Sequence, residues 1–193
     1  MKYKLSDKTK TVMGVTFFKI VALVDIDVYA IKAGDEGGWV EKIENLDQSG
    51  NAWVSGDAHV YGNAWVYGDA RVYGNARVYG NARVSGDAQV YGNARVYSNA
   101  QVYGNARVYS NARVSGDAWV YGDASKSPIA ISGLNWHVTI IDTKMVIGCQ
   151  EHDISAWEKF TDSEIAEMSG NALEFWNKNK AAIMTLANNH KVN

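Results

Sequence analysis

The chain has 193 residues, enough for one domain or two, and its 19 basic and 21 acidic side chains give a formal net charge of −2. A charge so close to zero excludes a wholly basic nucleic-acid-binding module, so we expect no sequence-specific nucleic acid as a partner. The single cysteine, Cys149, excludes an internal disulfide and is typical of a reducing compartment. The apolar run from Val15 to Val24 is interrupted by Lys19, so it predicts neither a signal peptide nor a membrane span. We therefore expect a cytoplasmic protein.

Residues 1–48 are expected to form an N-terminal β cap. Thr11 to Phe18 predicts a hairpin that turns near Met13-Gly14, and Ile20 to Asp25 predicts a further strand. The stretch from Ala33 to Gly38 predicts a glycine-rich turn. Two acids stand in this turn where a phosphate would bind, so the turn is not expected to cradle a nucleotide.

Residues 49–124 are dominated by a six-residue repeat. From Asn51 the chain reads NAWVSG, DAHVYG, NAWVYG, DARVYG and onward through twelve hexads, followed by Asp123-Ala124. Six residues advance a helix by about 600°, so the valines from Val54 to Val120 would point all round it and form no apolar stripe. Six is a multiple of the strand period, and Gly or Ser followed by Asn or Asp is turn chemistry. Each hexad is therefore predicted to be a three-residue strand and a corner.

Three such corners close a triangular coil of 18 residues, and coils stacked about 4.8 Å apart let each strand hydrogen-bond to the next. Twelve hexads make about four coils, with the valines and alanines pointing inward. The pattern resembles the hexapeptide repeat of left-handed parallel β-helices. That resemblance alone implies the left hand and a homotrimer, because such proteins are very often trimers that hold ligands between subunits. We expect a mainly β protein in which a left-handed parallel β-helix lies between two caps.

The outward residues beside each valine fall into three faces, because positions 18 apart stack on one another. The first face carries Trp53, Arg71, Gln89 and Arg107 beside Ser55, Tyr73, Tyr91 and Tyr109. The second face carries His59, Arg77, Arg95 and Arg113 beside Tyr61, Tyr79, Tyr97 and Ser115. The third face carries Trp65, Arg83, Gln101 and Trp119 beside Tyr67, Ser85, Tyr103 and Tyr121.

The second face is the leading candidate for a ligand site, because consecutive arginines beside tyrosines suit a planar or anionic partner. Its candidate binding residues are Arg77, Arg95, Arg113, Tyr61, Tyr79 and Tyr97. The third face is aromatic and carries one charge, a composition typical of interface cores. Its candidate self-association residues are Trp65, Tyr67, Tyr103, Trp119 and Tyr121. A solvated surface held together by Arg–Tyr stacking stays open as the simpler interpretation.

Residues 125–193 are predicted to form a C-terminal ββαα cap, with Pro128 marking the boundary after the repeat. Strands are predicted over Ile129–Ile131, Trp136–Ile141 and Met145–Gly148. The capping box from Thr161 to Glu164 predicts the start of a helix, and a second helix is predicted over Ala172–Asn188. Both caps cover coil ends, which would otherwise expose unpaired strand edges.

Segments outside the hexads resemble the YdcK-like hexapeptide-repeat proteins of bacteria. They read AIKAGDEGGWVE from Ala30, ENL from Glu44 and SGNAWV from Ser49. The tail around Val146-Ile147-Gly148-Cys149, with Trp176, is similar to tails of phage-type proteins. The resemblance implies the fold and a phage or prophage setting rather than an activity, since the family has no established reaction.

Catalytic residues are sparse in the repeat. Hexapeptide acyltransferases use a histidine general base and a loop extruded from the coil, but His59 is the only coil histidine and no loop interrupts the hexads. His59 is thus a weak catalytic candidate. Cys149 and His152, with His137 nearby in sequence, are too few for a metal site, and Cys149 is expected to end a buried strand. We expect no metal and no cofactor.

The sequence favours a non-enzymatic binding protein that presents Arg/Tyr faces, or clefts between subunits, to an anionic nucleotide-type small molecule or a host protein. In a phage setting this activity would interfere with host defence in the host cytoplasm. Two alternatives stay open: a hexapeptide-type acyltransferase that uses coenzyme A, and a structural spacer in a virion or filament.

Overall fold

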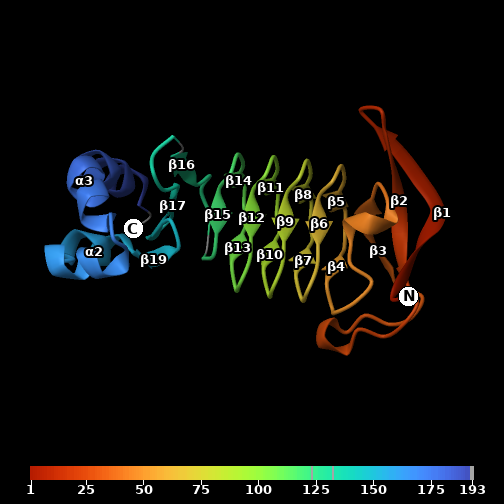
Figure 1. Cartoon of the computed structure of the whole chain (residues 1–193). Coiled ribbons are helices and arrows are strands. Elements are labelled where there is room, and N and C mark those ends of the chain that lie inside the picture. The colour runs from red at the N-terminus through yellow and green to blue at the C-terminus, as the bar shows by residue number, and fades with distance from the viewer. Residues whose placement is uncertain (123, 132, 192–193) are drawn as a thin grey trace. The chain divides into compact units, whose positions relative to one another are not determined.

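The computed structural model describes residues 1–122, 124–131 and 133–191, so Asp123 of the last partial hexad lies outside the described residues. The chain forms two compact units, Met1–Ser127 and Pro128–Asn193, which are described separately below. The first unit contains the N-terminal strands and the coil, and the second contains a small sheet with helices (Figure 1).

Each hexad forms a strand followed by a corner, as predicted, although the strand has two residues rather than three (Figure 1). The twelve strands are β4 (Trp53–Val54), β5 (His59–Val60), β6 (Trp65–Val66), β7 (Arg71–Val72), β8 (Arg77–Val78), β9 (Arg83–Val84), β10 (Gln89–Val90), β11 (Arg95–Val96), β12 (Gln101–Val102), β13 (Arg107–Val108), β14 (Arg113–Val114) and β15 (Trp119–Val120). Strands 18 residues apart pair in parallel, for example Val72 with Val90, and build three sheets. All twelve valines are 0% exposed, which confirms that they point inward.

The corners depend on residues that accept a left-handed backbone. Gly86, for example, has φ +67, and a Cβ built there would lie 3.0 Å from the backbone nitrogen of Gly104 in the next coil. Ser98 and Ser110 adopt φ 61 and 59 at equivalent corners. The Gly/Ser position of the hexad is therefore fixed by backbone conformation and by the close stacking of the coils.

Amide ladders along the corners were not predicted. Asn63 donates from Nδ2 to Asn81 Oδ1 at 3.3 Å, and Asn81 donates to Asn99 at 3.1 Å. Asn99 then donates to Asp117 at 3.0 Å. A second column runs from Asn75 through Asn93 to Asn111. The amide at this hexad position thus links successive coils in addition to favouring the turn.

The parallel β-solenoid has about five turns, because one turn precedes the hexads. Strand β3 (Glu36–Val40) pairs in parallel with β5, joining Val40 to Val60, and Leu46 bridges to Val66. These partners are 20 positions apart rather than 18, because Leu46 and Val54 are separated by eight positions instead of six. Counting hexads therefore gives four coils and misses this one, although Val40 and Leu46 are as buried as the repeat valines.

The N-terminal hairpin consists of β1 (Tyr3–Val12) and β2 (Val15–Ala22), with Met13 and Gly14 in left-handed conformations at the turn. The predicted hairpin is confirmed and extends further than expected. Strand β2 pairs antiparallel with β3, so the sheet under the second face continues as β1-β2-β3-β5-β8-β11-β14. The predicted strand over Ile20–Asp25 is wrong beyond Ala22, where β2 ends.

The predicted glycine-rich turn is also partly wrong. Gly37 and Gly38 lie inside β3 and are buried. The packing leaves no room for a side chain at Gly37, since a Cβ there would lie 2.6 Å from the Val54 carbonyl oxygen. Two short 3₁₀ turns, η1 (Asp27–Tyr29) and η2 (Ile43–Asn45), complete the N-terminal region.

Lys2 and Tyr3 close the first turn of the solenoid. The Lys2 ammonium donates to the carbonyl oxygens of Ser49, Gly50 and Ala52 at 3.2, 3.3 and 2.8 Å. The Tyr3 hydroxyl donates to the Leu46 carbonyl at 2.8 Å. Burial lowers the pKa of Lys2 to about 8, although nearby carboxylates favour its charged form. The long corner that carries the two extra residues is thus held by the start of the chain.

The second unit is a four-stranded antiparallel meander with helices packed on it. Its strands are β16 (Ile129–Ile131), β17 (Val138–Ile141), β18 (Lys144–Ile147) and β19 (Gln150–Asp153), paired in that order. Its helices are α1 (Ile154–Lys159), α2 (Asp162–Met168) and α3 (Ala172–His190). Strand β19 and helix α1 were not predicted, because β19 is polar and α1 is too short to show a period.

The capping box at the start of α2 is confirmed. The Thr161 hydroxyl accepts from the Glu164 backbone N–H, and the Glu164 carboxylate accepts from the Thr161 backbone N–H at 2.8 Å. Within residues 1–122, 124–131 and 133–191, no helix is long and apolar enough to cross a membrane.

Candidate functional site

The candidate binding residues of the second face form two straight columns. Strand pairing places Arg95 in register with Arg77 on one side and Arg113 on the other. The neighbouring tyrosine rings stack in parallel, with centroids 4.9 Å apart for Tyr61–Tyr79 and 5.0 Å apart for Tyr79–Tyr97. Stacking at the coil spacing therefore produces a continuous aromatic strip beside a row of guanidinium groups.

The first strands of this face are covered by the N-terminal hairpin. Phe17 of β2 is buried and meets the His59 and Tyr61 rings edge-on, with centroids 4.8 and 5.4 Å away. Between the hairpin and the coil lies a hollow of about 250 Å³. Its lining combines apolar, aromatic and cationic side chains: Lys10, Val12, Met13, Val15, Phe17, His59, Tyr61 and Arg77.

Cations gather at this end of the second face. The Lys10 and Lys19 ammonium groups lie 4.0 and 4.7 Å from the ring centroid of Trp39, which pairs with His59. Burial lowers the pKa of Lys10, with the nearby charges of Lys19 and Arg77 adding to the effect. A group of like charges held beside apolar surface favours the arrival of an anion.

His59 is neutral in this environment. Burial, together with the charges of Lys10 and Arg77, lowers its pKa to about 4. A general base works best when its pKa lies near the operating pH, so a histidine this weakly basic suits catalysis poorly. Its ring instead forms part of the aromatic wall under Phe17.

The third face carries the candidate self-association residues in two aromatic groups. Trp65 and Tyr67 stack with centroids 4.1 Å apart, and Tyr103 lies 3.8 Å from Tyr121 and 6.4 Å from Trp119. Trp65 and Trp119 are 40% and 38% exposed. This face therefore presents large rings to its surroundings.

The first face has a tyrosine stack of its own but is partly occupied. Tyr73, Tyr91 and Tyr109 stack with centroids 4.9 and 5.4 Å apart. Tyr29 lies over Arg71, whose guanidinium carbon is 4.5 Å from that ring, and the Tyr29 hydroxyl donates to the Asp69 carbonyl. The protein thus fills the start of this face with its own side chain.

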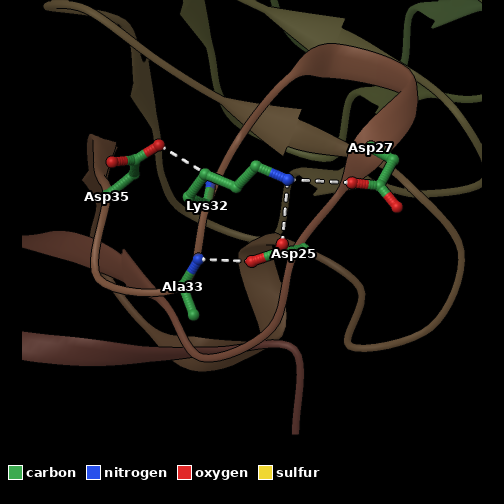
Figure 2. A network of polar contacts seen from close by, with 5 residues as sticks. All are labelled: Asp25, Asp27, Lys32, Ala33 and Asp35. Carbon is green, nitrogen blue, oxygen red and sulfur yellow. Dashed lines mark hydrogen bonds and ion pairs between the residues drawn. The ribbon is translucent and has the colours of Figure 1, made fainter.

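The loop before β3 is held by internal polar contacts, as Figure 2 shows. Lys32 pairs with Asp25 at 2.9 Å and with Asp27 at 3.1 Å. The backbone N–H groups of Ala33 and Lys32 donate to the carboxylates of Asp25 and Asp35. Because these backbone N–H groups already donate to carboxylates, they are not free to bind a phosphate.

Cys149 is exposed in the turn between β18 and β19, so the expectation that it ends a buried strand is wrong. Strand β18 ends two residues earlier, at Ile147, and Gly148 has φ 59 in the turn. Among the residues that the structure describes, no group of three His, Cys, Asp or Glu side chains could hold a metal ion.

Four residues of the second-face site escaped the sequence reasoning: Lys10, Phe17, Lys19 and Trp39. They belong to the cap rather than to the repeat, and only the docking of the hairpin brings them beside His59. Trp39 pairs with His59 across 20 positions instead of 18, so the repeat period did not place Trp39 on the second face.

Stacked two-residue strands, inward valines and glycine corners define the first unit as a parallel β-solenoid built from six-residue repeats. Residues 76–88, 88–99 and 100–113 match the family described as YdcK Beta solenoid repeat. Within the coil, residues 76–113 are therefore similar to the YdcK type of repeat. A comparison with curated proteins finds no match for the chain.

Proposed function

We propose that this protein is a non-enzymatic binding protein that holds a planar anionic small molecule of the nucleotide class on its second face. The observation that carries the proposal is the hollow beneath the hairpin, in which Lys10 and Arg77 lie beside the rings of Phe17, His59 and Tyr61. Its volume, about 250 Å³, is close to the lower end of ordinary ligand pockets and suits one base with its sugar.

The two parts of such a ligand match the two columns of the face. A base gains from stacking on aromatic rings, and a phosphate gains from charge-assisted hydrogen bonds to guanidinium and ammonium groups. Arg95 and Arg113 continue the cationic row beyond the hollow and are exposed. A second phosphate or nucleotide would find the same chemistry one coil further along.

A binding experiment on two matched variants tests this proposal. Calorimetric titration with ADP, cyclic di-AMP and cyclic GMP–AMP is expected to show binding by at least one ligand. Loss of one charge-assisted contact in Arg77→Gln is expected to weaken that binding by about 10-fold or more. Arg83→Gln is the control, because Arg83 is an exposed arginine on the third face. No binding across the panel, or equal weakening in both variants, refutes the small-molecule version and leaves a host protein as the partner.

We further propose a homotrimer that associates through Trp65, Tyr67, Tyr103, Trp119 and Tyr121 of the third face. The support is the exposure of the two indoles and the aromatic composition of that face. Analytical ultracentrifugation is expected to give about three times the 21.2 kDa chain mass, and Trp65→Arg with Trp119→Arg is expected to give the monomer. A monomer for the unmodified protein refutes this arrangement.

The proposed setting is the cytoplasm, and the host cytoplasm if a phage encodes the chain. There, sequestering a nucleotide signal or covering a host protein would interfere with host defence. The support is the similarity of the tail around Val146-Ile147-Gly148-Cys149 to tails of phage-type proteins. Expression in a bacterium that carries a nucleotide-signalled defence is expected to restore phage growth, and an Arg77→Gln variant is expected to fail.

A further inference from the structure

The tyrosine column of the second face ends one coil before the arginine row beside it. Serine replaces tyrosine in three of the twelve hexads, and one of these serines is Ser115. The column therefore runs Tyr61, Tyr79, Tyr97 and then Ser115, beside strands that follow one another as β5, β8, β11 and β14 (Figure 1). The last coil of this face thus lacks the ring that would continue the stack.

Tyr97 is the last ring of this column, and only one of its two faces is covered by another ring. The Tyr79 and Tyr97 rings stack with centroids 5.0 Å apart and an angle of 4° between their planes. Among the described residues, no other ring and no cation lies against Tyr97, which is only partly buried. At the other end of the column, Phe17 meets the Tyr61 ring edge-on. An open aromatic face is a platform on which a nucleobase can stack, and this column offers one above Ser115.

A row of three arginines connects the hollow beneath the hairpin with this platform. Arg77 lines the hollow, and Arg95 and Arg113 follow it in register, one coil apart. Arg95 and Arg113 are exposed, and neither forms a salt bridge within the part of the chain that the structure describes. Like charges on strands about 4.8 Å apart repel one another, so the row is stabilised by a partner that carries several negative charges in a line.

The spacing of the coils sets the length of a ligand that reaches both positions. The ring centroids are 4.9 Å apart for Tyr61–Tyr79 and 5.0 Å apart for Tyr79–Tyr97. A base stacked beyond Tyr97 would lie three coil steps, about 15 Å, from Tyr61 in the wall of the hollow. A mononucleotide has one base and can occupy only one of these positions. A linear dinucleoside polyphosphate has two bases, and the phosphates that join them would lie along the arginine row.

We propose that the second face binds a linear dinucleoside polyphosphate. Its first base lies in the hollow beneath the hairpin, and its phosphates lie along Arg77, Arg95 and Arg113. Its second base stacks on Tyr97, in the position that Ser115 leaves without a ring. This inference rests on the nucleotide binding proposed above and adds the class of nucleotide.

Two probes that differ by one adenosine test the inference on the full-length chain. Diadenosine tetraphosphate and adenosine 5′-tetraphosphate both carry four phosphates, but only the first has a second base. Calorimetric titration is expected to show that diadenosine tetraphosphate binds at least about 10-fold more tightly, because stacking of one base contributes about that factor. Charge alone predicts the opposite order, since adenosine tetraphosphate carries the larger negative charge.

A substitution at Ser115 tests the position of the second base. Ser115→Tyr supplies the missing ring, and the fold is expected to accept it because tyrosine occupies this position in the three preceding coils of the face. The variant is expected to bind diadenosine tetraphosphate only as tightly as adenosine tetraphosphate, with the affinity for adenosine tetraphosphate unchanged. Ser85→Tyr is the matched control, since Ser85 has the same hexad position on the third face, and it is expected to keep the 10-fold difference.

The possible failures separate this inference from the proposed function. Equal affinity for the two probes, or a preference for adenosine tetraphosphate, overturns the inference and leaves nucleotide binding on the second face in place. A preference for diadenosine tetraphosphate that persists in Ser115→Tyr also overturns it, because the second base then lies elsewhere. Binding of neither probe overturns both the inference and the small-molecule binding on which it rests.

Discussion

Removing one inward valine tests the physical basis of the solenoid. Val96 is 0% exposed at the centre of the coil and is in register with Val78 and Val114. Val96→Ala removes two buried methyl groups, which costs about 1.6 kcal/mol in transfer free energy at ~0.8 kcal/mol each. The cavity left behind, about 50 Å³, adds ~1.2 kcal/mol, so the free energy of unfolding is expected to fall by about 3 kcal/mol.

The matched control is Arg95→Ala, the outward neighbour in the same strand. Arg95 is exposed, so its loss is expected to change the free energy of unfolding by less than ~0.5 kcal/mol. Urea titration followed by far-ultraviolet circular dichroism measures both variants. Val96→Asp, which buries a carboxylate, is expected to leave the coil unfolded or aggregated. Equal losses in Val96→Ala and Arg95→Ala would refute the account of a core built from one valine column per sheet.

Three further predictions concern a corner, an acid transition and a helix start. Gly86→Val is expected to lower the midpoint of thermal unfolding, because a branched side chain must adopt φ +67 and press on the backbone of Gly104. Burial lowers the pKa of His59 to about 4. The folded state therefore loses stability as pH falls from about 6.5 through 4, and His59→Gln is expected to flatten the unfolding free energy across this range. An equally steep acid transition in that variant contradicts the assignment. Thr161→Ala is expected to cost about 1 kcal/mol in chemical denaturation, because Glu164 loses its capping partner.

The period of the hexads was sufficient to predict most of the first unit. Valines six positions apart point to the same side of the chain if they lie on strands, but not if they lie on a helix. Glycine or serine followed by Asn or Asp supplies the corners. The first turn escaped because two extra residues between Leu46 and Val54 break the period. Its corner is held by Lys2 from the start of the chain, a contact that no local pattern encodes.

The second unit was harder to predict for a different reason. Strand β19 (Gln150–Asp153) pairs on one side only, with β18, and consists of polar residues, so it lacks the alternation that marks a half-buried strand. A hollow in this unit depends on side chains from the β18–β19 turn and all three helices. The aromatic residues were visible in the sequence as core candidates, but the packing that leaves space between them was not.

A regular repeat does not by itself define a single binding site. Twelve similar hexads produce columns in which each coil offers nearly the same chemistry, so the repeat by itself provides no unique position for a ligand. Uniqueness arises where the hairpin lies over the second face and adds Phe17 and Lys10 to the columns that begin at His59 and Tyr61. The first face begins under Tyr29, which occupies the equivalent space with the protein's own ring. A ligand on the second face would therefore be anchored beneath the hairpin, and Arg95 and Arg113 would select for length by engaging whatever extends beyond it.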